Sequence, residues 1–299
     1  MPRLAYVNGR YAPHRDAVVH IEDRGYQFAD GVYEVIPVHQ SQLVDEGLHL
    51  DRLARSLAEL RIDTPMSRQA LRLVAYELMR RNDLTNGFVY IQVTRGVAPR
   101  DHRFPKTATR PAITMTTRQM PAKPREPAQG MKVISVPDQR WDRCDIKSIS
   151  LLPNVLAKQA AAEQGCDEAW QIDDAGFVTE GAATNAWIVT GDDRVVTRHA
   201  DESILSGITR LSLQRVLQEE GYALEVRPFT LEEAHAAREA FLTSSTNYVM
   251  PITEIDGKPV GNGHPGLLTL KLRAAYIDRV VEQGEGALEF RAYEETATA

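Results

Sequence analysis

Hydrophobic and polar positions follow the two periods of regular secondary structure along the chain. Apolar residues spaced three and four apart lie on one face of a helix. This spacing predicts helices over 49–62, 68–81, 154–164, 207–221 and 267–283. Ser67 is placed to cap the second of these helices, and Gly165 is placed to end the third.

Strands are predicted where β-branched and aromatic residues alternate with polar ones or run together between turn residues. Such stretches occupy 31–38, 88–96, 111–117, 131–136, 168–172, 185–190 and 239–246. Residues 4–11 alternate around Asn8-Gly9, a pair that tolerates positive φ and therefore favours a tight hairpin. Together the patterns predict a mixed α+β chain without repeats.

The best linker candidate is the segment 118–130, which has three prolines, a glycine and no hydrophobic periodicity. A chain of 299 residues is long enough for two domains. We therefore expect an N-terminal α+β domain over residues 1–120 and a C-terminal domain over residues 121–299.

Composition excludes several classes of protein. The chain has 43% hydrophobic and 25% charged residues, and its net charge of −6 argues against general nucleic-acid binding. No apolar run approaches the roughly 20 residues that span a bilayer, and the N-terminus lacks the apolar stretch of a signal peptide. Cys144 and Cys166 have no metal-ligand spacing. We expect reduced thiols, no metal site, no membrane or nucleic-acid partner, and a cytoplasmic location.

Lys147 stands out because it lies between Ile146 and a run, 148–152, that has the pattern of a half-buried segment. Burial of an ammonium group is costly, so lysines usually avoid such places. A desolvated lysine has a lowered pKa and can form a Schiff base with a carbonyl compound. A lysine that extends its ammonium group to the surface explains the same pattern.

Three further motifs could bind a flat, phosphorylated ligand. In VTEGAATN (178–185), Glu180 precedes a glycine and small residues that allow close approach to the backbone. SGITR (206–210) opens a helix whose free amides could bind phosphate. TSST (243–246) places hydroxyl groups at a strand end. A carboxylate beside the ring nitrogen of pyridoxal phosphate keeps that nitrogen protonated, but taken singly each motif is also typical of caps and turns.

The order of these motifs, with DIK first and TEG, GIT and TSST after it, resembles that of the fold-type IV pyridoxal-phosphate aminotransferases. This family includes D-amino acid aminotransferases, branched-chain aminotransferases and aminodeoxychorismate lyases. The resemblance extends over nearly the whole chain and includes 23–35, 49–56, 93–105, 145–159, 165–170, 178–185, 205–210, 243–246 and 254–258. It implies a homodimer with a smaller N-terminal α/β sandwich and a larger C-terminal pseudo-β-barrel, with the site between them.

The resemblance also implies roles for individual residues. Lys147 matches the lysine that holds pyridoxal 5'-phosphate as a Schiff base and then moves a proton between substrate and cofactor. Glu180 matches the partner of the pyridine nitrogen, and Arg52 the phosphate-binding arginine. The remaining cofactor-binding positions are Leu205, which packs on the ring, and the phosphate cup of Ile208, Thr209, Ser244 and Ser245.

The segment PRDHRFP (99–105) distinguishes members of the family. Arg100 and His102 match the pair that holds the substrate α-carboxylate in D-amino acid aminotransferases, contributed across the dimer interface. Tyr33 and Tyr90 match pocket tyrosines. We therefore expect transamination between a D-amino acid such as D-alanine and a 2-oxo acid such as 2-oxoglutarate or pyruvate.

Other activities are possible on the same fold. An (R)-amine or branched-chain aminotransferase and an aminodeoxychorismate lyase remain alternatives. A cofactor-free binding protein is a further one, against which Lys147, Glu180 and Arg52 argue. Ala182-Ala183 stands where the family often has serines, and Pro37 where relatives carry a charged residue, so both bear on substrate range.

Overall fold

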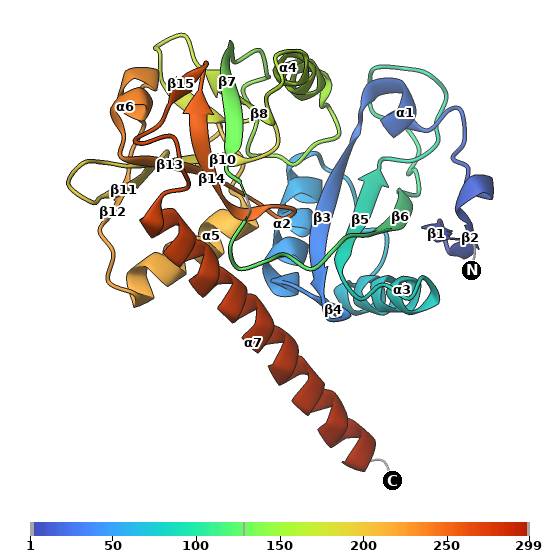
Figure 1. The fold of residues 1–299 in the computed structure, drawn as a ribbon. Helices are drawn as coiled ribbons and strands as arrows, with labels where there is room; N and C mark the ends of the chain where they lie inside the picture. Colours follow the sequence, from blue (N-terminus) through green and yellow to red (C-terminus); the bar gives the residue numbers. More distant parts are fainter. Residues whose placement is uncertain (1–2, 128, 298–299) are drawn as a thin grey trace. The chain divides into compact units, whose positions relative to one another are not determined.

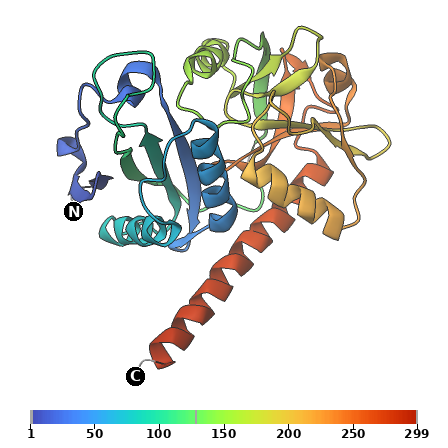
Figure 2. The same cartoon turned by 180° about the vertical axis from the view of Figure 1, so that it is seen from behind.

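Two compact units make up the chain, and each is built around its own sheet (Figures 1 and 2). The computed structural model describes residues 3–127 and 129–297, with side chains as far as Gln283. The first unit contains the chain up to Ala122, the segment Ile146–Ser150 and the residues from Val281 onward. The second contains Lys123–Asp145 and Leu151–Val280. These units interleave along the sequence, so the division into domains 1–120 and 121–299 stays a prediction.

The first sheet has six antiparallel strands in the order β2-β1-β6-β5-β3-β4. Its strands are β1 (Leu4–Val7), β2 (Arg10–Pro13), β3 (Gly31–His39), β4 (Gln42–Leu43), β5 (Gly87–Thr94) and β6 (Ala112–Gln119). The expected hairpin is present: Asn8 and Gly9 have φ values of 47° and 98° and join β1 to β2. This positive φ at both turn residues matches the right-handed twist of the strands.

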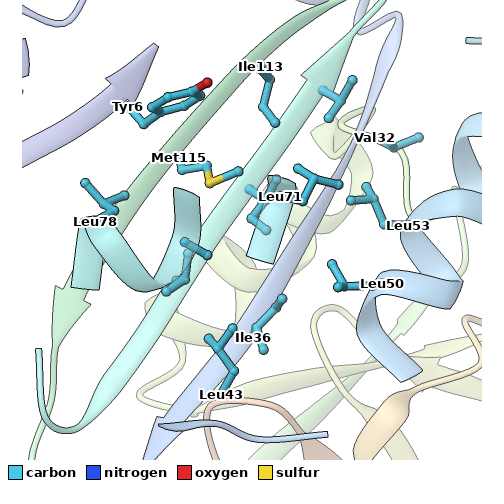
Figure 3. Close-up of a cluster of buried hydrophobic side chains, with 14 of the residues drawn as sticks. Tyr6, Val32, Ile36, Leu43, Leu50, Leu53, Leu71, Leu78, Ile113 and Met115 are labelled. Atoms are coloured by element: carbon cyan, nitrogen blue, oxygen red, sulfur yellow. The ribbon is translucent and has the colours of Figure 1, made fainter. Parts of the chain in front are cut away.

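Helices α2 (Glu46–Glu59) and α3 (Arg68–Arg81) pack on this sheet. Figure 3 shows Leu50 and Leu53 of α2 facing Val32 and Ile36 of β3 within the buried cluster. The predicted helix over 49–62 ends earlier, at Glu59, because Arg61 adopts a left-handed φ of 53°. Two short elements, η1 (His14–Asp16) and α1 (Arg24–Phe28), lie between β2 and β3 in the sequence.

The alternation of β3 positions the candidate site. Val32, Glu34 and Ile36 are fully buried, whereas Tyr33 and Val35 point to the opposite, partly exposed face. A carboxylate among core positions needs a charged partner, since an isolated buried charge is very costly. Tyr33 lies directly across from Gln92 of β5, so the exposed face of the two strands is polar and aromatic.

The second sheet has nine strands, in the order β12-β11-β10-β13-β14-β7-β8-β9, with β15 paired to β14. Its strands are β7 (Met131–Pro137), β8 (Glu168–Ile172), β9 (Val178–Gly181), β10 (Asn185–Val189), β11 (Val195–Thr197), β12 (Leu224–Val226), β13 (Glu239–Ser244), β14 (Tyr248–Ile255) and β15 (Lys258–Pro259). Three pairs are parallel, namely β7 with β8, β7 with β14, and β11 with β12. This mixed pairing agrees with the predicted α+β class.

Three helices belong to the second unit, namely α4 (Leu152–Glu163), α5 (Ile208–Glu219) and α6 (Leu231–Ala236). The last helix, α7 (Leu267–Ala297), belongs to the second unit up to Val280 and to the first unit from Val281. Helix α4 packs against β7 and β8, and α5 against β12 and β13. Within the described part of the chain, none of the helices combines the length and hydropathy that a membrane-spanning segment needs.

Candidate active site

Lys147 belongs to a short segment, Ile146–Ser150, that pairs with β3 along its edge near Val32. We call this stretch the Lys147 segment. The Tyr33 amide donates to the Lys147 carbonyl over 3.0 Å, and the Ile149 amide donates to the Gly31 carbonyl over 3.1 Å. The Lys147 amide donates to Ser56 Oγ over 3.3 Å. These bonds on both flanks fix the backbone of the lysine, as a reactive side chain requires.

The side chain of Lys147 is half-buried against an aromatic wall. Its Nζ lies 4.3 Å from the centroid of the Tyr33 ring, whose negative face attracts an ammonium group. Tyr33 stacks on Tyr90 with centroids 5.6 Å apart, and the Tyr90 hydroxyl donates to Gln92 Oε1 over 2.7 Å. Burial, followed by the neighbouring Tyr33, raises the pKa of Tyr90 to about 12, so its phenol stays neutral. The structure thus brings Lys147, Tyr33 and Tyr90 together.

Arg52, on α2, is buried with Glu34. Its Nε and Nη2 donate to the two carboxylate oxygens over 2.7 and 2.8 Å, and His49 Nδ1 lies 2.8 Å from Glu34 Oε2. Burial alone would raise the pKa of Glu34, but the charge and hydrogen bonds of Arg52 and the contact with His49 outweigh it and lower the pKa to about 2. Glu34 and His49 were not predicted as site residues; a charge at a core position of β3 was the available signal.

Glu180, on β9, is buried at the centre of a hydrogen-bond network in the second unit. It accepts from Asn185 Nδ2 over 2.8 Å and from the Leu205 amide over 3.2 Å, and it pairs with Arg140. Asn185 also donates to the Leu205 carbonyl over 2.9 Å. The carboxylate is therefore held by three donors that orient it and favour its ionised form.

Arg140 links Glu180 to a second carboxylate. Its Nη2 donates to Asp138 Oδ2 over 2.7 Å and to the Ser203 carbonyl over 3.1 Å. Burial works to lower the pKa of Arg140, but the hydrogen bond to Asp138 and the charge of Glu180 outweigh it and raise that pKa. Arg140 was missed in the sequence because it meets Glu180 from 40 residues away. Asn185 is only five residues from Glu180 and lies within the motif 178–185, so its position in that motif was the available signal.

The amino end of α5 lies beside the same asparagine. A Cβ on Gly207 would overlap Asn185 Oδ1, so only glycine fits at this N-cap. No side chain caps the helix, and the first-turn residues Ile208 and Thr209 are buried. Such a helix end can bind an anion through its amides and dipole.

Hydroxyl groups follow at the end of β13, the strand that pairs with β10. Thr243 lies opposite Asn185, and next to it Ser244 Oγ is 3.4 Å from Thr246 Oγ1. Ser245 is half-buried between them. Leu205, Glu180 and the start of α5 thus converge around Asn185, and Ser244 follows the residue opposite that asparagine.

These residues fit the cofactor that the motifs imply. The set contains a fixed carboxylate, an uncapped helix end and strand-end hydroxyls, which match a protonated ring nitrogen and a phosphate group. Thr184 Oγ1, next to the network, is buried with no hydrogen-bond partner among the described residues. Buried hydroxyls are normally satisfied, so this one is available to a polar ligand or a water molecule. Within that part of the chain, no group of three or more His, Cys, Asp or Glu residues is arranged to hold a metal.

Arg100 and His102 lie in the β5–β6 loop (residues 95–111), in the first unit, and both are exposed. The Arg100 guanidinium lies 4.6 Å from the centroid of the Phe28 ring, and the His102 ring is 5.3 Å from the same ring. One aromatic side chain therefore supports both residues of the predicted carboxylate-binding pair.

A family model, amino-transferase class IV, matches residues 31–255. The chain belongs to this family. It is therefore an aminotransferase, as the order of the motifs predicted.

Named relatives extend the match over almost the whole chain. The chain is 40% identical to a D-alanine aminotransferase of Bacillus licheniformis over 276 residues, which cover 92% of this chain and 96% of that protein. It is also 40% identical to a D-alanine aminotransferase of Listeria monocytogenes serotype 4b over 286 residues, covering 95% and 98%.

Solved structures confirm the fold. A branched-chain amino acid aminotransferase of T.th., determined with pyridoxamine 5'-phosphate, superimposes with a TM-score of 0.85 at 24% identity, covering 94% of each chain. A fold IV-transaminase of Curtobacterium pusillum superimposes with a TM-score of 0.75 at 25% identity, covering 90% of this chain and 98% of the other. The predicted fold-type IV architecture is confirmed.

Proposed function

We propose that this aminotransferase uses pyridoxal 5'-phosphate to transfer the amino group of a D-amino acid, such as D-alanine, to a 2-oxo acid such as 2-oxoglutarate or pyruvate. The observation that carries the proposal is the pair Arg100 and His102 on the Phe28 ring, in a chain that aligns over 92% of its length with a D-alanine aminotransferase. A guanidinium and an imidazole that contact the same ring suit the α-carboxylate that both substrates carry.

Each part of the cofactor would have its own protein contacts. Glu180 would pair with the ring nitrogen, and Leu205 would pack against the ring. The phosphate would be held by Arg52, Ile208, Thr209, Ser244 and Ser245. When bound, pyridoxal phosphate supplies an electron-withdrawing ring that stabilises negative charge on the substrate Cα.

Lys147 would bind the cofactor covalently and act as the general base. Once the substrate amine has taken its place on the cofactor, the freed Nζ would accept the proton from the substrate Cα and later return it, a role for which the fixed backbone of the Lys147 segment provides the positioning. Tyr33, against the amine, and Tyr90, stacked behind it, would form the wall of the substrate pocket. Glu180 keeps its negative charge through Arg140, Asn185 and the Leu205 amide.

We also propose a homodimer with a shared active site and a cytoplasmic location. Arg100 and His102 are exposed, and exposed apolar side chains lie at Ile21 and Tyr26, just before and within the helix that carries Phe28, as a surface covered by a second copy would require. Cys144 and Cys166 are both free thiols, which suits a reducing compartment.

The proposal is tested by the visible spectrum of the purified holoenzyme. We expect D-alanine to bleach the absorption band of the lysine-bound cofactor, and L-leucine to leave it unchanged. Bleaching by L-leucine alone would refute D-amino acid specificity while leaving the family assignment intact. Lys147→Ala should lower turnover by at least about a hundredfold, since general acid–base steps contribute roughly 10²–10⁴-fold. Near-normal turnover in this variant would exclude Lys147 from the mechanism.

A further inference from the structure

Helix α1 lies beneath the loop that carries Arg100 and His102, and its first residue binds that loop from inside. Arg24 is only 3% exposed. Its Nη1 donates to the carbonyls of Asp101 over 2.6 Å and Arg103 over 3.3 Å, and its Nη2 donates to the carbonyl of His102 over 3.4 Å. One buried guanidinium thus binds three consecutive carbonyl groups of the loop.

The charge of Arg24 is balanced inside the same unit. Asp30 accepts from Arg24 Nε over 2.8 Å and from Arg95 Nε over 2.8 Å. Burial would raise the pKa of Asp30, but the hydrogen bonds and charges of Arg95 and Arg24 outweigh it and lower that pKa. Arg95 in turn lies 3.8 Å from the Phe104 ring, further along the loop. The loop is therefore tied to one ion cluster at two points, through its backbone carbonyls and through the Phe104 side chain.

The last residue of α1, Phe28, supports side chains of the loop rather than its backbone. Phe28 comes four residues after Arg24, on the same face of the helix. Its ring contacts the guanidinium groups of Arg24 and Arg100, at 4.9 and 4.6 Å from the centroid, and the ring of His102 at 5.3 Å. A long exposed arginine loses conformational freedom on binding, and this support reduces that loss in advance.

We propose that α1 is the element that sets the preference for carboxylate-bearing substrates: Arg24 fixes the loop backbone, and Phe28 fixes Arg100 and His102 in the orientation that binds an α-carboxylate. This inference rests on the proposed roles of Arg100 and His102. Arg24 and Phe28 are positioning residues, because neither needs to touch the substrate. Because Asp30 balances the charge of Arg24, Arg24 acts on substrate binding by positioning the loop and not by its own charge.

The experiment compares two substrates of similar shape in single-turnover reactions of the holoenzyme. D-Alanine and 2-aminopropane differ only in the carboxylate, which a methyl group replaces. We expect Phe28→Leu to raise the half-saturation concentration for D-alanine about tenfold, the equivalent of losing one or two cation–π contacts. The value for 2-aminopropane should stay within about twofold, as expected if only carboxylate recognition is weakened.

Matched variants separate positioning from a general loss of structure. Phe28→Tyr keeps the ring and should behave like the unchanged protein. Leu73→Ala alters a 64% exposed apolar residue of α3, outside the proposed dimer surface, and should change neither value. Arg24→Lys keeps the charge beside Asp30 but loses the three-carbonyl clamp, so hydrogen exchange of the Asp101–Arg103 amides should accelerate while cofactor affinity stays unchanged.

The outcomes are distinguishable from those of the proposed function. If the unchanged holoenzyme converts only L-leucine, D-amino acid specificity fails, and L-leucine with its decarboxylated analogue tests α1 in the same way. If Phe28→Leu raises both half-saturation values by the same factor, or if Arg24→Lys leaves loop exchange and substrate preference unchanged, the inference about α1 is wrong.

Discussion

The buried pair of Glu34 and Arg52 makes a quantitative prediction about stability. Glu34→Gln keeps the size and hydrogen-bonding capacity of the side chain but removes the negative charge that faces Arg52 over 2.7 and 2.8 Å. The pKa of Glu34 is lowered from 4.5 to about 2, although burial by itself would raise it. This difference measures how much more the folded state favours the ionised carboxylate than the unfolded chain does.

The magnitude follows from the two pKa values. A lowering from 4.5 to about 2 corresponds to about 3 kcal/mol of folding free energy at pH 7. Because the folded-state pKa is depressed, this stabilisation is complete above pH 4.5 and is lost as the pH falls toward 2. At pH 3 a little under half of it should remain. Glutamine does not titrate, so the difference between the two proteins should shrink by about 2 kcal/mol between pH 7 and pH 3.

Urea unfolding at constant cofactor concentration, followed from pH 7 to pH 3, measures this difference. His49 also contacts Glu34, and burial lowers the pKa of His49. Titration of His49 therefore contributes to the pH dependence of the unfolding free energy. Repeating the comparison with His49→Asn in both proteins removes that contribution and keeps the Arg52 contact. A free-energy difference that stays constant with pH in both backgrounds would refute the assignment of Glu34 as the ionised partner of Arg52.

Two further predictions concern the second unit. Gly207→Ala should displace Asn185 and weaken pyridoxal phosphate affinity about tenfold, since a hydrogen bond to a charged group contributes roughly 1.5–3 kcal/mol. The control is Gly191→Ala, at a glycine with open space around it. Equal affinities of the two variants in a fluorescence titration would contradict the role of Asn185. Burial raises the pKa of the Cys144 thiol to about 12, whereas Cys166 is only half-buried. A thiol reagent at pH 8 should therefore modify Cys166 quickly and Cys144 only after unfolding. Equal modification rates would contradict the burial of the Cys144 thiol.

The long amphipathic elements could be predicted from the sequence because burial and period coincide in them. The leucines of α2 at positions 50, 53 and 57 are all buried, as their spacing required. The predicted end of this helix at residue 62 was wrong. Ile62 is buried and continues the hydrophobic pattern, but the Ile62 amide bonds back to the Leu57 carbonyl in a bond that closes the helix, so the helix has already ended.

Short or proline-containing elements were missed. Helix α1 has five residues, too few to show a period, and depends on Asp23, which accepts from the Gly25 amide over 2.8 Å. Strand β14 lies in the middle of its sheet although it contains Pro251, a residue that argues against a central strand. The pairing of β14 with β7 begins only at Ile252, which leaves the proline outside that ladder.

Some residues of the candidate site could be predicted from the sequence and others could not. Lys147 and Glu180 could be found because each lies in a short motif and the motifs occur in a characteristic order. Arg140 and Arg24 could not, since Arg140 meets Glu180 from 40 residues away and Arg24 meets the Asp101 carbonyl from 77 residues away. Such partners are set by strand order and loop path, which local spacing does not encode.

The Lys147 segment also has a consequence for synthesis of the protein. Strand β3 pairs with β5 on one side, and on the other side β4 covers only Val38 and His39, while the Lys147 segment covers the end near Val32. The ribosome makes the six strands before this segment, and roughly one to six seconds separate the end of β6 from Lys147 at about 5–20 residues per second. During that interval the nascent sheet carries an open strand edge, the kind of edge that templates aggregation. The reactive lysine therefore arrives on the piece of chain that closes this edge, and substitutions that weaken its docking should lower the yield of folded protein even where they leave the chemistry intact.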